Sequence, residues 1–303
     1  MTVDTSRNYE TLVGRDGWLF MTKIDGLFEK HRGEITLSEA ELRQWQLTLE
    51  LRRGWLNYRG IKYAFVVAPN KASIYTEFLP DGYPISDKRP LVVLKDYLAR
   101  NSDFRIIDPA DHLRAQKGGK RELYYRTDEH WNDVGAFKAY QYILRQLPGG
   151  TKLDAVERSR LEEKPRNFVG ELAAVLPTPY QEKSFQVSIT GAQSSLAYRN
   201  KPKGRGTVEV RLSKNTALPR AVMFRDSFAS ALLPYVAESF SRIVSVSSRQ
   251  MLFDLIESEK PDIVITEMVE RYLDPAPDDI KMKSFEDFCG VPLATIKDVT
   301  LKD

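Results

Sequence analysis

A serine at a predicted strand-to-helix turn is the first candidate for chemistry in this sequence. Residues 221–224 are apolar and typical of a buried strand, and Arg225, Asp226 and Ser227 follow them directly, before a predicted helix. At the carboxyl edge of a sheet, Ser227 would lie near the positive end of that helix with its own amide free. A nucleophile and a donor to a developing oxyanion are both useful at such a position.

A second polar stretch offers the base that a serine hydroxyl needs. Residues 124–132 read Tyr-Tyr-Arg-Thr-Asp-Glu-His-Trp-Asn, which places Asp128 two positions before His130. In an extended loop, side chains at this spacing project from the same face. The carboxylate can therefore hold one ring nitrogen while the other nitrogen faces the serine. The pattern predicts Ser227 as nucleophile, His130 as general base and Asp128 as the group that orients His130.

The other histidines and acids are weaker candidates for this chemistry. His31 lies in a polar run and is predicted to be a solvated turn residue, and His112 falls in a predicted surface helix. Asp226 is a competing partner for the imidazole, or else it bonds the backbone of its own turn. Three scattered histidines and one cysteine give no metal-ligand spacing, and there is no glycine-rich phosphate loop. We therefore expect no metal and no cofactor.

The elements that must position these residues alternate between strand and helix. Residues 38–58 are a predicted helix, because Ser38 and Glu41 match a capping box. Asn132 is a predicted N-cap, which places Asp128 and His130 on the loop just before a helix. Helical patterns also cover residues 91–98, the stretch after Ser227 as far as Pro234, and the stretch around 252–256. Five short apolar runs are predicted strands: residues 62–68, 104–107, 221–224, 243–246 and 262–266. Strands separated by helices indicate a mostly parallel sheet.

Two regions depart from this alternation. Residues 14–20 read as a turn into a short aromatic strand, which predicts a packing hairpin. Residues 151–220 contain prolines, glycines and short alternating pieces, and are interpreted as a β-rich insertion. That insertion could cover the active edge as a lid or substrate platform, or it could connect without a chemical role. The whole chain, residues 1–303, is predicted to be one domain with this insertion.

The residues carry a resemblance to a known family. Arg-Asp-Ser-Phe at 225–228, Thr-Asp-Glu-His-Trp-Asn at 127–132 and Gly-Arg-Asp-Gly-Trp-Leu-Phe at 14–20 resemble the alginate O-acetyltransferase family, the AlgJ/AlgX group of SGNH-hydrolase-like proteins. The resemblance covers most of the chain and is weakest between 151 and 220. It implies a three-layer α/β/α sandwich. The serine block follows the Asp/His block, as in this acetyltransferase group, whereas ordinary SGNH hydrolases have the reverse order.

The resemblance also implies an activity, partners and a location. The activity is acetyl transfer to hydroxyls of an exported polysaccharide, with the acetyl donor delivered by a membrane-bound O-acyltransferase. A periplasmic or otherwise extracytoplasmic location follows from the same resemblance, although residues 1–10 do not resemble a signal peptide and no run approaches a membrane span. A net charge of +3 from 45 basic and 42 acidic residues gives no reason to expect nucleic acid.

The oxyanion donors are the part of the site that the resemblance leaves unassigned. The position before Asp226 is Arg225 instead of the glycine of Gly-Asp-Ser blocks, and no separate glycine or asparagine block matches. By their place at predicted strand ends, Asn70, Lys71 and Arg271 join Arg225 as candidates for substrate or oxyanion binding.

Two alternative functions remain open from the sequence. The same catalytic set would make a carbohydrate acetylesterase if water outcompetes the sugar. A non-catalytic polysaccharide-binding or assembly subunit would use its aromatic residues, including Trp18, Trp55 and Trp131, to stack on sugars.

Overall fold

A six-stranded, mostly parallel sheet forms the centre of the fold. The computed structural model describes residues 11–22, 24–149, 153–200 and 205–301. The strands are β3 (Lys62–Ala68), β6 (Ser194–Arg199), β7 (Val208–Ser213), β8 (Arg220–Arg225), β9 (Arg242–Ser247) and β10 (Ile263–Val269). They lie in the order β3-β10-β8-β9-β7-β6. The first four run parallel, and β7 and β6 are added antiparallel at one edge. The predicted mostly parallel sheet is therefore confirmed.

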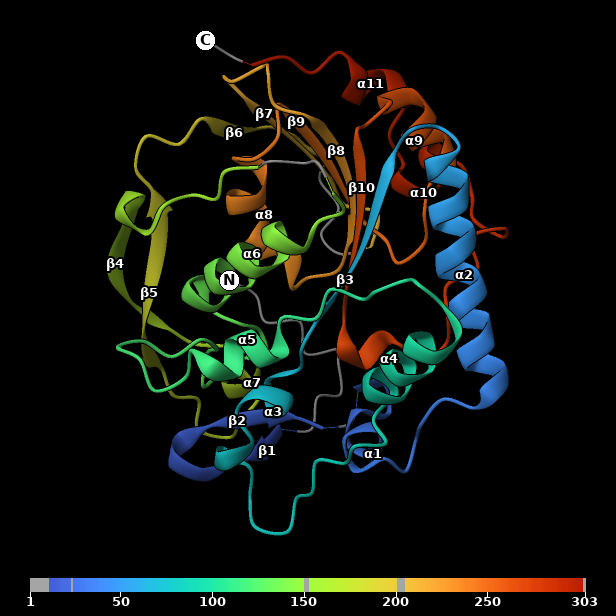
Figure 1. Cartoon of the computed structure of the whole chain (residues 1–303). Coiled ribbons are helices and arrows are strands. Elements are labelled where there is room, and N and C mark those ends of the chain that lie inside the picture. The colour runs from blue at the N-terminus through green and yellow to red at the C-terminus, as the bar shows by residue number, and fades with distance from the viewer. Residues whose placement is uncertain (1–10, 23, 150–152, 201–204, 302–303) are drawn as a thin grey trace.

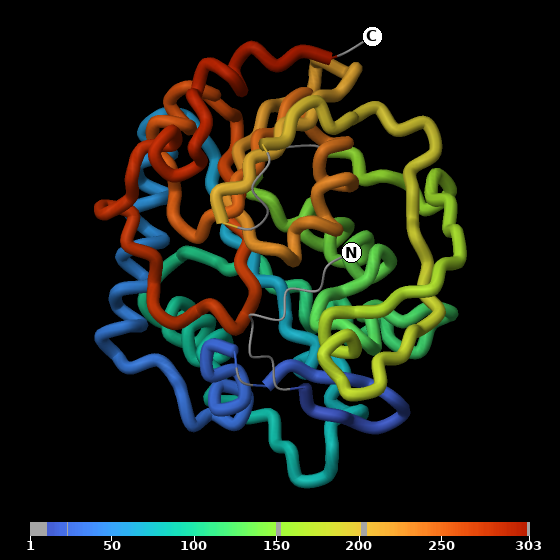
Figure 2. The backbone as a smooth tube through the Cα atoms, turned by 180° about the vertical axis from the view of Figure 1, so that it is seen from behind, coloured from blue at the N-terminus to red at the C-terminus, as the bar shows by residue number. Residues whose placement is uncertain are grey.

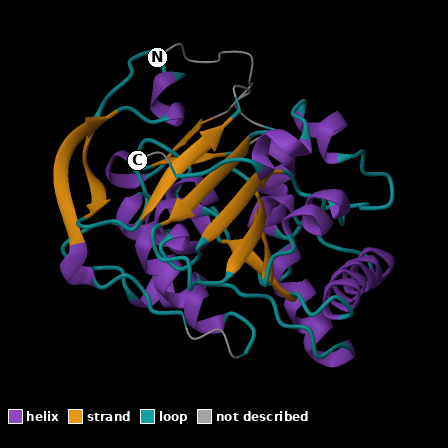
Figure 3. Cartoon of the chain, turned by 90° about the horizontal axis from the view of Figure 1, so that it is seen from above, coloured by secondary structure: helices purple, strands orange, loops and turns teal. Residues whose placement is uncertain are grey.

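Helices cover both faces of this sheet and make three layers (Figure 1). One face packs against α5 (Ala110–Ala115), α6 (Asp133–Gln146) and α8 (Ala229–Ala237). The other packs against α2 (Glu39–Asn57), α4 (Pro90–Asn101), α9 (Phe253–Glu259), α10 (Phe285–Cys289) and α11 (Leu293–Lys297). Figure 3 shows the strands lying between these two groups of helices. Because side chains alternate along a strand, Val66 faces the first layer and Val67 the second. The chain is an α/β/α sandwich.

The predicted helix caps are present. Ser38 Oγ accepts a hydrogen bond from the Glu41 amide while the Glu41 carboxylate accepts from the Ser38 amide, so α2 begins with a capping box. Asn132 Oδ1 accepts from the amides of Val134 and Gly135, each at 3.0 Å, and caps α6. The second cap fixes where the polar loop at 124–132 ends and α6 begins.

Two predictions about secondary structure were wrong. Residues 104–107 are not a strand, because only Ile107 exchanges backbone hydrogen bonds with β3, through Phe65 and Val67, each at 2.9 Å. Pro109 then ends the pairing, since the chain turns there into α5. Pro234 does not interrupt its helix either. It lies inside α8, which continues to Ala237.

The segment between residues 151 and 220 divides between two places. In its first part, β4 (Leu161–Phe168) and β5 (Glu182–Ile189) pair as a separate antiparallel sheet, with the short helix α7 (Glu171–Ala174) between them. Its last part supplies β6 and β7 to the central sheet, so this part is not an appendage. Residues 150–152 and 201–204 lie outside the described part of the chain.

An N-terminal hairpin closes the end of the sheet where β3 finishes. It consists of β1 (Thr11–Val13) and β2 (Leu19–Met21), as predicted, and is followed by the helix α1 (Leu27–Arg32). Leu19 and Met21 pack against Leu172 and Ala173 of α7. Figure 2 shows the segment containing α7 descending beside this hairpin. Two regions far apart in sequence thus meet next to the short helix α3 (Lys71–Ile74), which follows β3.

Among the described residues, no helix combines enough length and hydrophobicity to cross a membrane. The predicted absence of a signal-peptide pattern concerns residues 1–10, which lie outside the described residues.

Candidate active site

Ser227 occupies the turn between β8 and α8. Its side chain is exposed, whereas both neighbours, Asp226 and Phe228, are buried. The Asp226 carboxylate accepts from the Phe228 amide at 2.9 Å and from the Val269 amide at 2.7 Å. Asp226 therefore ties the turn to the end of β10, which is the backbone role expected as the alternative to pairing with the imidazole.

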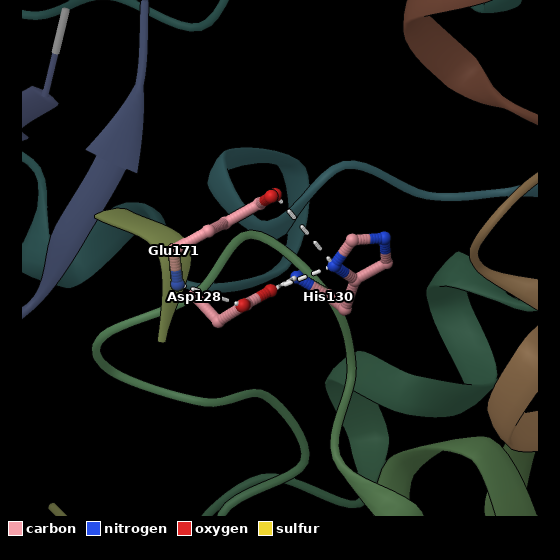
Figure 4. Close-up of side chains that lie close together, drawn as sticks. All are labelled: Asp128, His130 and Glu171. Atoms are coloured by element: carbon pink, nitrogen blue, oxygen red, sulfur yellow. Dashed lines mark hydrogen bonds and ion pairs between the residues drawn. The ribbon is translucent and has the colours of Figure 1, made fainter. Parts of the chain in front are cut away.

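His130 and Asp128 lie beside this serine. Nε2 of His130 is 2.8 Å from Oγ of Ser227, and Nδ1 of His130 is 2.7 Å from Oδ1 of Asp128. Since a carboxylate accepts from Nδ1–H, the neutral imidazole keeps Nε2 free to accept the serine proton. Figure 4 shows the Asp128 side chain directed at the ring. The structure brings the three sequence-predicted catalytic candidates into one hydrogen-bonded chain.

A buried lysine holds the loop that carries this pair. Nζ of Lys71 donates to the backbone carbonyls of Tyr125 at 3.2 Å, Arg126 at 3.4 Å and Asp128 at 2.6 Å. Burial lowers the pKa of Lys71 to about 8. Because its amine is engaged by these carbonyls, Lys71 supports the loop, and none of these three hydrogen bonds reaches Ser227.

Gly170 and Glu171 complete the surroundings of Asp128, and the sequence analysis missed both. The Glu171 amide donates to Oδ2 of Asp128 at 3.1 Å, and the Glu171 carboxylate lies 4.0 Å from Nδ1 of His130 (Figure 4). A Cβ atom at Gly170 would overlap the Thr127 carbonyl and lie 2.6 Å from Cβ of Asp128. These two residues come from the β-rich segment, which carries no motif that could have marked them.

The electrostatics of the site raise the pKa of His130 and lower that of Asp128. Burial opposes both charges, but the Asp128 carboxylate outweighs it and raises the pKa of His130 above its ordinary value. Burial likewise opposes ionisation of Asp128, yet His130 and the hydrogen bonds from the His130 and Glu171 amides hold the pKa of Asp128 low. Below the turn, burial and the neighbouring Asp226 raise the pKa of Glu267 well above its usual range.

The candidates for oxyanion or substrate binding differ in which of their side-chain atoms already have a hydrogen-bond partner. Arg225 bonds Glu209 at 3.1 Å and its own neighbours, the Asp226 carbonyl and Ser230 Oγ. Nδ2 of Asn70 lies 3.2 Å from Nε2 of His31. Among the described residues, buried side-chain atoms without a hydrogen-bond partner are Nε of Arg225, Oδ1 of Asn70, and Nε and Nη1 of the buried Arg271. Within the same residues, the Ser227 amide shows no hydrogen bond, as the sequence predicted for an oxyanion donor.

Two sequence-based expectations are overturned by burial. His31 is not solvated: it lies in α1 at 1% exposure, because Tyr83 and Asn70 from distant segments pack around its ring. Trp18 and Trp131 are 0% and 1% exposed, so neither can stack on a sugar, and of the three named tryptophans only Trp55 is partly exposed.

Asp128, His130 and Glu171 also form a cluster of possible metal ligands, with one atom from each within 4.8 Å of the others. The Nδ1 atom of His130 is already bonded to Asp128, and a metal ion there would displace the hydrogen bond that orients the imidazole. The geometry therefore fits a hydrogen bond between Asp128 and His130 better than a shared metal ion.

The sandwich, with a serine at the carboxyl edge of its sheet, places the chain in the SGNH-hydrolase-like class of α/β proteins. The sequence model of the family described as "SGNH hydrolase-like domain, acetyltransferase AlgX" matches residues 11–243. The chain belongs to this family.

Known relatives agree with this assignment. The "probable alginate O-acetylase AlgJ" of Pseudomonas aeruginosa is 30% identical over 171 residues, which cover 55% of this chain and 41% of that protein. The match thus spans less than half of that relative's length.

Solved structures share the fold. PatB1 of Bacillus cereus with a sulfonyl adduct has a TM-score of 0.69 at 19% identity, covering 92% of this chain and 99% of its own. The O-acetyltransferase domain of Pseudomonas putida AlgJ has a TM-score of 0.58 at 20% identity, covering 95% of this chain and 99% of its own. At this identity the two structures establish the fold alone.

Proposed function

We propose that this chain is a polysaccharide O-acetyltransferase that works through an acetyl-Ser227 intermediate. The observation that carries the proposal is the continuous hydrogen-bonded chain from Ser227 Oγ through His130 to Asp128, with distances of 2.8 and 2.7 Å. Membership of an acetyltransferase family supports the choice of acetyl as the group transferred. The same three residues are the nucleophile, base and orienting carboxylate in this proposal.

In the first half-reaction, Ser227 Oγ attacks the carbonyl carbon of the acetyl donor while Nε2 of His130 takes the hydroxyl proton. Asp128 stabilises the imidazolium that forms, and the free amide of Ser227 faces the developing oxyanion. When the tetrahedral intermediate collapses, the donor's leaving oxygen takes the proton from His130. Acetyl-Ser227 remains on the protein.

In the second half-reaction, a sugar hydroxyl replaces the leaving group. His130 removes its proton as the sugar oxygen attacks the acetyl carbon, and returns that proton to Ser227 Oγ when the acyl–serine bond breaks. The products are the acetylated sugar and the free serine. No metal or cofactor takes part in either half.

A polymer is a suitable acceptor because Ser227 is exposed at the surface. A cavity of about 430 Å³ is lined by residues of the 120–126 loop and of β5, and neither Ser227 nor His130 is among its lining residues. The relatives' name, alginate O-acetylase, supports a polysaccharide acceptor. By the same family relationship we infer an extracytoplasmic location and an acetyl donor delivered by a membrane-bound O-acyltransferase.

An acetylesterase is the second candidate, since water also reaches an exposed acetyl-Ser227. One assay separates the two: an acetyl ester is supplied with an oligosaccharide, and acetylated sugar and free acetate are measured together. A transferase produces acetylated sugar in excess of the acetate formed, whereas an esterase produces acetate alone. Ser227→Ala and His130→Ala should each lower both products by at least about 10³-fold. Wild-type turnover in His130→Ala would favour the non-catalytic binding subunit.

A further inference from the structure

A pair of buried carboxyl groups lies beneath the turn that carries Ser227. One belongs to Glu267, near the end of β10, and the other to Asp226, directly before the serine. Oε2 of Glu267 accepts from the Asp226 amide at 3.2 Å, and the two side chains are within hydrogen-bonding reach of each other. Two buried acids this close cannot both be charged at low cost, so one of them should keep a proton.

The hydrogen bonds around the pair indicate which acid keeps that proton. Both oxygens of Asp226 are acceptors, Oδ1 from the Phe228 amide at 2.9 Å and Oδ2 from the Val269 amide at 2.7 Å. Such donors favour a charged carboxylate. Oε1 of Glu267, by contrast, is buried and has no hydrogen-bond partner among the described residues. An oxygen that bears a proton can donate it, and the Asp226 carboxylate is the neighbouring acceptor.

The surroundings of Glu267 do little to stabilise a second negative charge. Its side chain lines a small cavity with apolar side chains of β3, β8, β10, α6 and α8. In the described structure, the charged or titratable groups that face it are Asp226, Arg225 from β8 and Tyr140 from α6. The Arg225 guanidinium attracts a negative charge, but it already binds Glu209 at 3.1 Å. Burial and Asp226 therefore raise the pKa of Glu267 well above its ordinary value of 4.5.

We propose that Glu267 is a positioning residue that acts as a neutral acid, donating its proton to the Asp226 carboxylate and so holding Ser227 within reach of His130. This inference rests on the proposed function, because it concerns the same nucleophile. Asp226 ties the turn to the end of β10, and Glu267 holds Asp226 by both its amide and its side chain. Loss of the proton would put two negative charges together beside Ser227, and the turn would have to shift.

The first test compares two substitutions of Glu267 by their turnover of an acetyl ester at pH 7. Glu267→Gln keeps a donor toward the Asp226 carboxylate and an acceptor for the Asp226 amide. We expect its kcat/KM to stay within about threefold of wild type. Glu267→Leu has neither group, so the turn should loosen and kcat/KM should fall by about 10- to 100-fold.

The second test is the pH dependence of folding, which requires no catalysis. An acid whose pKa is raised in the folded protein stabilises the fold at low pH, and this contribution is lost as pH rises. Glutamine does not titrate and shows no such loss. The equilibrium constants for unfolding are measured in urea for wild type and Glu267→Gln. From about pH 4.5 up to the folded-state pKa, the ratio of wild type to variant should grow by about tenfold per pH unit.

Glu238→Gln is the matched control for the second test. Glu238 is also buried, at the end of α8, but it accepts from the Gln193 and Ser194 amides and pairs with Arg160 at 3.2 Å. Burial opposes its charge, yet these donors outweigh burial and lower the pKa of Glu238. Its glutamine variant should therefore give a ratio that stays constant above about pH 4.5, and its acetyl-ester turnover should match wild type.

The inference is overturned if Glu267→Gln loses as much activity as Glu267→Leu, because the charged acid would then be the form that holds the turn. Wild-type turnover in Glu267→Leu would contradict a positioning role. A ratio for Glu267→Gln that stays flat with pH would contradict the neutral acid, and this comparison decides even if Glu267→Leu does not fold. Because unfolding is measured without any acetyl transfer, failure of this inference is distinguishable from failure of the proposed function.

Discussion

The Nε2 atom of His130 lies 2.8 Å from Oγ of Ser227, although 97 positions separate the two residues in the chain. One residue precedes α6 and the other follows β8, so the contact depends on how a helix packs on the sheet. Trp131 supports the same junction, because its indole Nε1 donates to the Phe228 carbonyl at 2.9 Å. A proton can pass from the hydroxyl to the imidazole with little rearrangement.

Activity should fall on the acid side of neutrality, because only neutral His130 can accept the serine proton. The Asp128 carboxylate raises the pKa of His130, so kcat/KM should decline as pH falls through a value above about 6.5, the ordinary histidine pKa. Asp128→Asn removes the charge that stabilises the imidazolium. The acid limb should then shift to lower pH while the rate drops by about 10⁴-fold. Measuring acetyl-ester turnover against pH in the wild type and in Asp128→Asn checks this. An acid limb at the same pH in both proteins would contradict it.

Gly170→Ala should damage the site without touching Ser227 or His130. The added methyl group would meet the Thr127 carbonyl and Cβ of Asp128, so the loop that carries Asp128 must shift. A displacement of about 1 Å is enough to lower kcat/KM by about 10²-fold. Turnover of an acetyl ester measures the effect.

Gly54→Ala is the control for that substitution. Gly54 lies inside α2 with nothing within 4 Å of an added Cβ. We expect unchanged turnover and a gain of about 0.5–1 kcal/mol in the free energy of unfolding, because alanine is the better helix former. If the two alanine variants lost activity to the same extent, the close approach at Gly170 would not be the cause.

Lys71→Met should also loosen the loop that carries Asp128, by removing the amine that holds its carbonyls. The methionine fills similar space but leaves the carbonyls of Tyr125, Arg126 and Asp128 without their donor. Buried carbonyls without partners cost about 1–3 kcal/mol each, so the loop should rearrange and acetyl-ester turnover should fall by about 10- to 100-fold. Lys95→Met removes a lysine that pairs with Asp108 at 2.6 Å and is 41% exposed, and should leave turnover unchanged. Equal turnover in the two variants would count against a positioning role for Lys71.

Much of this arrangement could be predicted from local sequence. The strand at β3 and the caps at Ser38 and Asn132 are set by short-range patterns, and the structure has them where they were expected. The Asp-x-His spacing likewise determines its own geometry, since Asp128 Oδ1 accepts from both the amide and the ring of His130. These features need no information from distant parts of the chain.

The remaining features depend on contacts that no local pattern encodes. Glu171 reaches Asp128 across 43 positions, from a segment without a motif. His31 was misread as solvated because its neighbours in sequence are polar, while its neighbours in space, Tyr83 and Asn70, close over it. That Arg271 is buried against Phe228 and Tyr272, rather than exposed at a strand end, is visible only once the side chains around it are placed.

Acetylation of Ser227 tests the central claim most directly. The protein is incubated with an activated acetyl ester, quenched in acid and digested, and the peptide that contains Ser227 is analysed by mass spectrometry. The account predicts one acetyl group on Ser227 in the wild type and its loss in Ser227→Ala and, at short times, in His130→Ala. An adduct of equal amount that persists in Ser227→Ala would contradict the acetyl-serine mechanism.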